Sequence, residues 1–142
     1  MPAETAKRSY NSTRRTLQAA QTREEVLRAG TRLFGDTGWA GTTLAAIADE
    51  AGVSVETIYK GFGSKKALLR RALDVALVGD SEPVPLAERT EFLQLDQGTI
   101  SERLAHAAWL IADQHGRTAG VWEAAIEAAG ADEDMAALRS DL

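Results

Sequence analysis

The residues best able to do chemistry lie in a short polar stretch from Ser54 to Lys65. Within it, a helix predicted over 55–60 buries Ile58 and turns its remaining side chains outward. These outward residues are Glu56, Thr57, Tyr59 and Lys60. Hydroxyl, carboxylate and ammonium groups on one exposed face can form hydrogen bonds and bind anions, but they supply no nucleophile with its base. The stretch therefore predicts a recognition surface and not an enzyme active site.

Two short helices must position this surface. The first is predicted to begin with Thr42 or Thr43 as N-cap and to end at Gly52, and Ser54 caps the second. Small or apolar residues let the two helices approach closely: Ala48, Ala51 and Val53. Two helices joined by such a three-residue turn form a helix-turn-helix unit, whose second helix enters the major groove of DNA. The pattern therefore predicts a DNA-binding domain over 22–78.

Further elements are predicted on the N-terminal side of this unit. A capping box of Thr22 and Glu25 indicates a helix that begins there, and Gly38 is a plausible left-handed stop. Residues 1–21 are polar and basic, with little to bury, so we expect a flexible arm. On the C-terminal side, Ser64 caps a fourth helix with a sustained apolar stripe.

The stretch 79–85 is the clearest linker, because its two prolines cannot continue a helix. Beyond it we expect a second, helical domain over 86–142. Its predicted elements are a helix over 86–95, a helix opened by a Thr99 and Glu102 capping box, a helix from Thr118 to Ala129 and a last helix opened by Asp132. No stretch alternates with period two, so the predicted fold class is all-α.

Charge is distributed unevenly along the chain. Residues 1–71 carry twelve Lys and Arg against seven Asp and Glu, and residues 72–142 carry four against fourteen. The first half therefore has a net charge of +5 and the second half −10, which together give −5. DNA attracts a local basic face, while the acidic half can point away from it. The chain has no cysteine and no apolar run or leader of the membrane or secretory type, so we expect a cytoplasmic protein.

The motifs of the first half resemble those of the TetR (tetracycline-repressor-like) family of transcriptional regulators. The shared residues are Leu33-Phe34, Gly38-Trp39, Thr42-Thr43-Leu44, Ile47-Ala48, Ala51-Gly52-Val53-Ser54, Thr57-Ile58-Tyr59, Phe62, Ser64-Lys65 and Ala67-Leu68-Leu69. The resemblance implies a helix-turn-helix head followed by a helical ligand-binding and dimerisation domain. It also implies a ligand-responsive repressor that reads a palindromic operator in double-stranded DNA and responds to a small-molecule inducer.

The resemblance also implies roles for individual residues. Thr43 and Tyr59 would bind phosphates, and Lys65 would grip a phosphate beside the N-terminal amides of its helix. The remaining residues of the DNA-binding set are Ser54 and the predicted base readers Val55, Glu56, Thr57 and Lys60.

This chain departs from the family pattern at two positions. Gly61 stands where the family often has an aromatic residue or histidine, which puts that backbone contact in doubt. Lys66 replaces a commoner acidic residue, and it fits a surface lysine as well as a phosphate contact. Arg14, Arg15 and Arg23 could extend into the minor groove, although the arm also fits a plain solvated tail.

The second half offers candidates for a ligand pocket, because in this family it houses a small-molecule cavity. These candidates are Trp109, Trp122 and His106, although both tryptophans also fit a core. His106 and His115 lie nine residues apart, on opposite faces of a helix, which argues against a shared metal site. The acidic run 132–134 fits the first turn of a helix better than a cation site. We therefore expect no metal and no cofactor.

Dimerisation in this family uses C-terminal helices, which would lie beyond Leu142. We therefore expect a homodimer from the resemblance but a regulatory domain that is incomplete in this chain. Two alternatives stay open: a truncated, monomeric DNA-binding fragment, and a protein-interaction module without a working ligand pocket.

Overall fold

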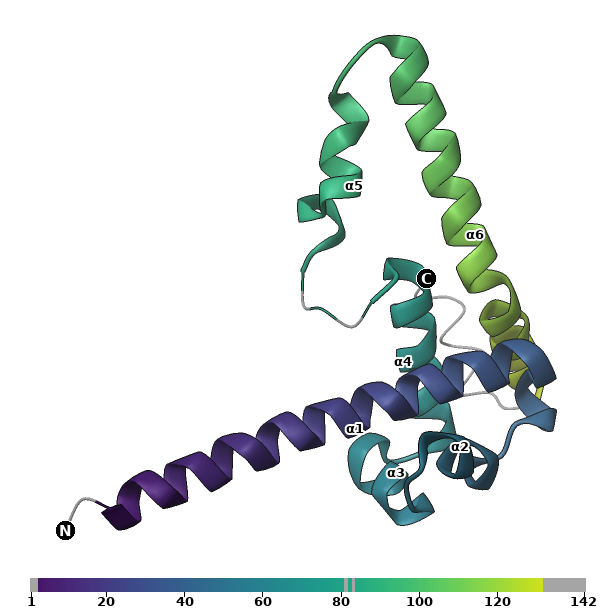
Figure 1. Cartoon of the computed structure of the whole chain (residues 1–142). Coiled ribbons are helices and arrows are strands. Elements are labelled where there is room, and N and C mark those ends of the chain that lie inside the picture. The colour runs from purple at the N-terminus through teal and green to yellow at the C-terminus, as the bar shows by residue number, and fades with distance from the viewer. Residues whose placement is uncertain (1–2, 81, 83, 132–142) are drawn as a thin grey trace.

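The chain folds into helices, as Figure 1 shows, and no strand occurs over the described ranges. The computed structural model describes residues 3–80, 82 and 84–131, with side chains from residue 12 onward except at residue 86. The elements are α1 (Ala3–Gly41), α2 (Leu44–Ala51), α3 (Val55–Phe62), α4 (Lys65–Val78), η1 (Leu86–Glu88), α5 (Thr90–Leu93), η2 (Gln94–Asp96) and α6 (Ile100–Ala131). The predicted all-α fold class is confirmed. The predicted last helix from Asp132 lies outside the described residues.

The first helix is longer than the sequence pattern predicts. It begins at Ala3, so Thr22 lies inside it and the predicted capping box there is wrong. Glu25 instead accepts a hydrogen bond from the side chain of Gln21, at 3.3 Å. Because no glycine or proline interrupts residues 3–29, the helix continues through the stretch for which the composition predicts a flexible arm. The predicted stop is confirmed, since Gly38 breaks the helix with φ 71° and ψ −173°.

The core joins both halves of the chain. Large side chains from α1 to α4, such as Phe34, Ile47, Ile58 and Leu68, are fully buried. The C-terminal part of α6 closes this core with the small residues Val121, Ala124 and Ala128. The close packing of α6 on α1 depends on Gly120, where a Cβ would lie 2.8 Å from the backbone of Gly35. Part of α6 therefore belongs to the same packed unit as the first four helices.

The segment after α4 is less regular than predicted. In place of one helix over 86–95, it forms the short elements η1, α5 and η2. Arg89 fastens the segment through hydrogen bonds to Asp80 at 2.5 and 2.9 Å, which hold the pKa of that carboxyl below its ordinary value. In Figure 1, α5 and the start of α6 stand away from the first four helices.

The last described helix is continuous where two helices were expected from the pattern. It runs through Gly116, so the predicted start at Thr118 is wrong, and the Thr118 hydroxyl donates to the Gln114 carbonyl instead. The capping box before it is confirmed, because Thr99 N donates to Glu102 (2.8 Å) and Glu102 N to the Thr99 hydroxyl (3.3 Å). No helix within the described ranges is long and apolar enough to cross a membrane.

Candidate nucleic-acid interface

Local capping chemistry sets the geometry between α2 and α3. Thr43 is the N-cap of α2, and its hydroxyl accepts from Ala46 N at 3.1 Å. Thr42 is buried instead, with its hydroxyl 2.7 Å from the Gly38 carbonyl. Gly52 ends α2 in the left-handed region, at φ 67°, a conformation that costs glycine little. The chain therefore turns sharply into α3, and the predicted helix-turn-helix geometry is present.

The second helix of this unit presents a continuous polar face. Ser54 caps α3 by accepting from Thr57 N at 3.1 Å, and Ile58 anchors the opposite face in the core. The exposed side chains are Glu56, Thr57, Tyr59 and Lys60, whereas Val55 is half-buried. Glu56 and Lys60 form an exposed ion pair at 3.1 Å. Such surface pairs are weak, so each side chain can exchange its partner for another one. Three of the four predicted base readers, Glu56, Thr57 and Lys60, thus share one accessible surface.

Arg23 of α1 secures the other end of α3, a contact that the pattern of residues did not reveal. Its guanidinium donates to the Gly61 carbonyl at 2.5 Å and lies 4.4 Å from the centre of the Phe62 ring. A cation is favoured there by the negative end of the helix dipole and by the aromatic face. Gly61 lies inside α3, and a Cβ at this glycine would lie 4.0 Å from Arg23 Nη1. Arg23 therefore holds α3 in place.

Lys65 begins α4 and is turned toward the end of α1. Its Nζ donates to the Trp39 carbonyl at 2.5 Å and lies 4.0 Å from the centre of the Trp39 ring. Burial lowers the pKa of Lys65, while the nearby Glu127 carboxylate opposes that shift. Glu127, on α6, accepts from Trp39 N (2.7 Å) and Ala40 N (3.0 Å). These residues join α1, α4 and α6, so the Lys65 ammonium is less open to solvent than the pattern implies.

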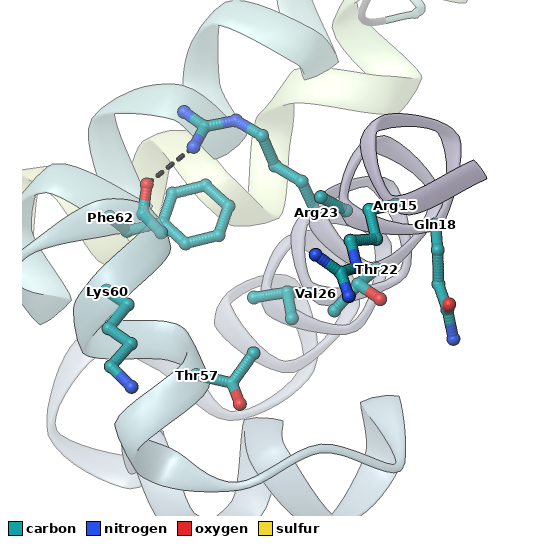
Figure 2. A pocket seen from close by; sticks show the side chains of 10 residues that line it. Arg15, Gln18, Thr22, Arg23, Val26, Thr57, Lys60 and Phe62 are labelled. Carbon is teal, nitrogen blue, oxygen red and sulfur yellow. Dashed lines mark hydrogen bonds between the residues drawn. The ribbon is translucent and has the colours of Figure 1, made fainter. Parts of the chain in front are cut away.

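A groove of about 470 Å³ lies beside the recognition face, between α1 and α3 (Figure 2). Figure 2 shows Arg15, Thr22 and Val26 on the α1 wall and Thr57, Lys60 and Phe62 on the α3 wall. The full lining is Arg15, Gln18, Ala19, Thr22, Arg23, Val26, Thr57, Lys60, Gly61 and Phe62. Three of these residues are cationic and none is acidic.

The predicted ligand residues do not line the apolar cavity of the second half. That cavity, of about 140 Å³, lies between α4, the α5 segment and α6, and its lining is Leu77, Phe92, Leu95, Ala107, Leu110, Ile111, Gln114 and Arg117. Trp109 is 54% exposed and Trp122 39% exposed, so the reading of both as core residues is wrong. His106 stacks on Trp109 at 5.9 Å, with Nε2 2.8 Å from the Glu91 carbonyl. The helical spacing of Ala107, Leu110, Ile111 and Gln114 is the signal that indicates the cavity wall.

The first half of the chain matches a known protein family. Residues 26–72 fit the family model described as bacterial regulatory proteins, tetR family. The chain is 35% identical over 88 residues to the HTH-type transcriptional regulator HbdR of Aromatoleum sp., covering 61% of this chain and 35% of that protein. It is 45% identical over 62 residues to the HTH-type transcriptional regulator TtgR of Pseudomonas putida, covering 43% of this chain and 30% of that protein. The chain thus spans about a third of the length of these curated relatives.

A solved structure shares the fold. A protein from Mesorhizobium loti, assigned in its description to the TetR family of transcriptional regulators, superposes with a TM-score of 0.63. The superposition covers 83% of this chain and 58% of the other, at 24% sequence identity. At that identity the likeness shows the arrangement of helices, and its coverage of 83% means that it extends over parts of both halves of this chain.

Proposed function

We propose that this chain, whose residues 26–72 match the family model described as bacterial regulatory proteins, tetR family, regulates transcription by binding operator DNA through α3. The main observation in support is the exposed polar face of α3. The Ser54 cap at one end of α3 and the Arg23 contact at the other end position this helix in the helix-turn-helix unit. In such frames the second helix lies in the major groove with its side chains at base edges. The basic first half of the chain supports the same orientation.

Individual contacts follow from this placement. Thr57 and Lys60 would read base edges together with Ser54, Val55 and Glu56. Thr43 and Tyr59 would position the domain through phosphates, and the exposed Tyr59 ring suits this role. Lys65 would join them by exchanging the Trp39 carbonyl for a phosphate oxygen at the N-terminus of α4.

We further propose that the protein acts in the cytoplasm as a dimeric, ligand-responsive repressor of a palindromic operator. A ligand would enter the apolar cavity between α4, the α5 segment and α6, while Trp109, Trp122 and His106 remain predicted contacts that lie outside its present lining. The present cavity of about 140 Å³ is smaller than the 300–1,000 Å³ typical of ligand sites. Occupation would therefore shift α6, which is bonded to the ends of both α1 and α4 in the DNA-binding head.

The test is the salt dependence of binding to a duplex selected from random DNA by the protein itself. Tyr59→Phe and Lys65→Ala should weaken binding to all duplexes alike, and Lys65→Ala should reduce the salt slope by about 0.9, the value for one phosphate contact. Arg103→Gln is the control of equal charge change, since Arg103 lies in the first turn of α6 and donates to the Leu95 carbonyl. The start of α6 lies far from α3 in Figure 1. Lys65→Ala also removes the Trp39 contact, so its folding is measured in parallel, whereas Tyr59→Phe removes only an exposed hydroxyl.

Two results would contradict the proposal. Unchanged affinity in both variants would show that Tyr59 and Lys65 do not contact phosphates. Absence of salt-sensitive binding to any duplex would favour a protein-interaction module. Substitution of Thr57 or Lys60 should change the sequence that wins the selection, because base readers set specificity and phosphate contacts do not.

A further inference from the structure

The groove between α1 and α3 extends the recognition face onto the N-terminal part of α1. We propose that this groove binds the DNA strand that flanks the major groove, with Arg15 as a phosphate contact, an inference that rests on the proposed function. Thr57 and Lys60 belong both to the groove and to the exposed face of α3. A duplex bound to the exposed face of α3 would therefore lie directly beside this groove.

The charge of the groove matches a phosphate strand. Its lining includes Arg15, Arg23 and Lys60 and no acidic side chain. Arg23 already donates to the Gly61 carbonyl, and Lys60 pairs with Glu56. Within the described side chains no hydrogen bond or ion pair engages Arg15, which leaves its guanidinium fork available for phosphate oxygens. Phe62, which is half-buried, gives the groove apolar surface on which a sugar ring can rest.

The helical form of residues 3–21 gives this contact a fixed position. At 1.5 Å per residue, the part of α1 before Thr22 is about 30 Å long, which corresponds to about nine base pairs along the axis of a duplex at about 3.4 Å each. The side chains from residue 12 to residue 21 are all exposed, so no other part of the described protein covers them. Because residues 3–21 are helical, Arg15 has a defined position beside α3, in contrast to a residue on a flexible arm threaded into the minor groove.

The experiment compares two neighbouring arginines of α1. Arg15→Ala removes a groove residue, and Arg14→Ala removes the same charge from the adjacent position, which does not line the groove. The probe is the duplex selected by the protein itself, extended to about 40 base pairs so that two half-sites about one helical turn apart have about nine base pairs on each side. We expect Arg15→Ala to weaken binding about tenfold and to lower the salt slope by about 0.9, and Arg14→Ala to change affinity less than about threefold.

Two additional measurements separate a groove contact from diffuse charge. Arg15→Lys keeps the charge and should restore most of the salt slope. Hydroxyl-radical footprinting should show protection of the flanking strand by the wild type, and this protection should be lost in Arg15→Ala while protection of the backbone at the central half-sites persists. All three variants lie on an exposed helix face, so their folding should match that of the wild type.

The outcomes distinguish this inference from the proposed function. Equal losses in Arg14→Ala and Arg15→Ala, or no loss in either while the wild type binds, would overturn the groove contact and leave the role of α3 intact. If the wild type itself shows no salt-sensitive binding to duplex DNA, the proposed function fails and the groove contact fails with it.

Discussion

The two halves of α6 carry similar apolar side chains but have different surroundings. In the C-terminal half, Val121 and Ala124 are buried against α1 and α4. In the N-terminal half, Ile100, Leu104 and Ile111 are 76%, 66% and 56% exposed. Hydrophobicity alone therefore does not decide which half is buried. The buried half is the one in which Gly120 allows the backbone of α1 to approach closely.

Polar contacts reinforce the same difference. The C-terminal half of α6 supplies Glu127 to the end of α1, and Arg117 to the Ala76 carbonyl at the end of α4, at 3.3 Å. Helix ends leave unpaired carbonyl and amide groups, so these side chains satisfy groups that would otherwise need water. The N-terminal half has its own cap, Thr99 with Glu102, within four residues of sequence. One half of α6 is thus packed on the head formed by α1 to α4. The other half contacts mainly the segment after α4, and its Gln114 also donates to the Leu77 carbonyl of α4 at 3.3 Å.

The largest expected effect is at the helix contact of the buried half. Gly120→Ala places a Cβ 2.8 Å from the backbone of Gly35, which cannot move aside as a flexible side chain can. We expect the free energy of unfolding, measured by urea denaturation, to fall by about 1–3 kcal/mol. The control is Gly116→Ala on the same helix, where a Cβ meets nothing within 4 Å. That change should raise the free energy of unfolding by about 0.5–1 kcal/mol, since alanine favours helix over glycine.

Opposite signs for the two glycine variants would establish that close approach, and not helix propensity, fixes the position of α6. A stabilising Gly120→Ala would contradict the packing of α6 on α1. It would also remove the reason for assigning the C-terminal half of α6 to the head.

The difference between local interactions and contacts between distant residues explains which parts of this structure could be predicted from the sequence. Caps at Thr43, Ser54 and Ser64 and the turn at Gly52 were predictable, because each depends on hydrogen bonds within a few residues. The Thr22 cap failed because a capping residue begins a helix only where the preceding residues cannot continue it. Local chemistry thus defined the helix-turn-helix frame.

Contacts between distant residues could not be predicted from the pattern. Arg23 meets Gly61 across 38 positions, and Lys65 meets Trp39 across 26. From the sequence we predicted that Arg23 and Lys65 contact DNA, because a sequence shows which residues are charged. It does not show the backbone carbonyls at helix ends to which these side chains donate in the folded protein. For the same reason the exposure of Trp109 could not be foreseen, because it depends on whether another helix faces that side of α6.

A smaller effect is expected where α6 binds the end of α1. Glu127→Ala removes the acceptor for Trp39 N and Ala40 N, and should lower the free energy of unfolding by about 1 kcal/mol, because the exposed amides regain bonds to water. Glu127→Gln keeps one acceptor oxygen and should show about half that loss. The control is Glu123→Ala, one turn earlier on the exposed face, which should change stability by less than about 0.5 kcal/mol. Equal effects of Glu127→Ala and Glu123→Ala would show that this carboxylate does not tie α6 to the head.

The smallest expected effect is confined to the exposed half and depends on pH. The Thr99 amide and hydroxyl lower the pKa of Glu102 below its ordinary value of 4.5. The cap therefore stabilises the start of α6 fully above that pH, and the stabilisation is lost as pH falls through 4.5 toward the lower folded-state pKa. Hydrogen exchange should accelerate at the first amides of α6 across this window, while the amides near Val121 stay protected by the core.

Thr99→Ala provides the matched control for this acid effect, since it removes the accepting hydroxyl and one of the two donors but keeps the Thr99 backbone amide. In that variant the Glu102 carboxyl, followed by NMR, should titrate closer to 4.5, and the first turn should exchange faster already at neutral pH. An unchanged Glu102 titration would show that the capping box does not set this pKa. Equal acceleration near Val121 would be more consequential, because it would mean that the two halves of α6 unfold together and that the exposed half is not locally stabilised.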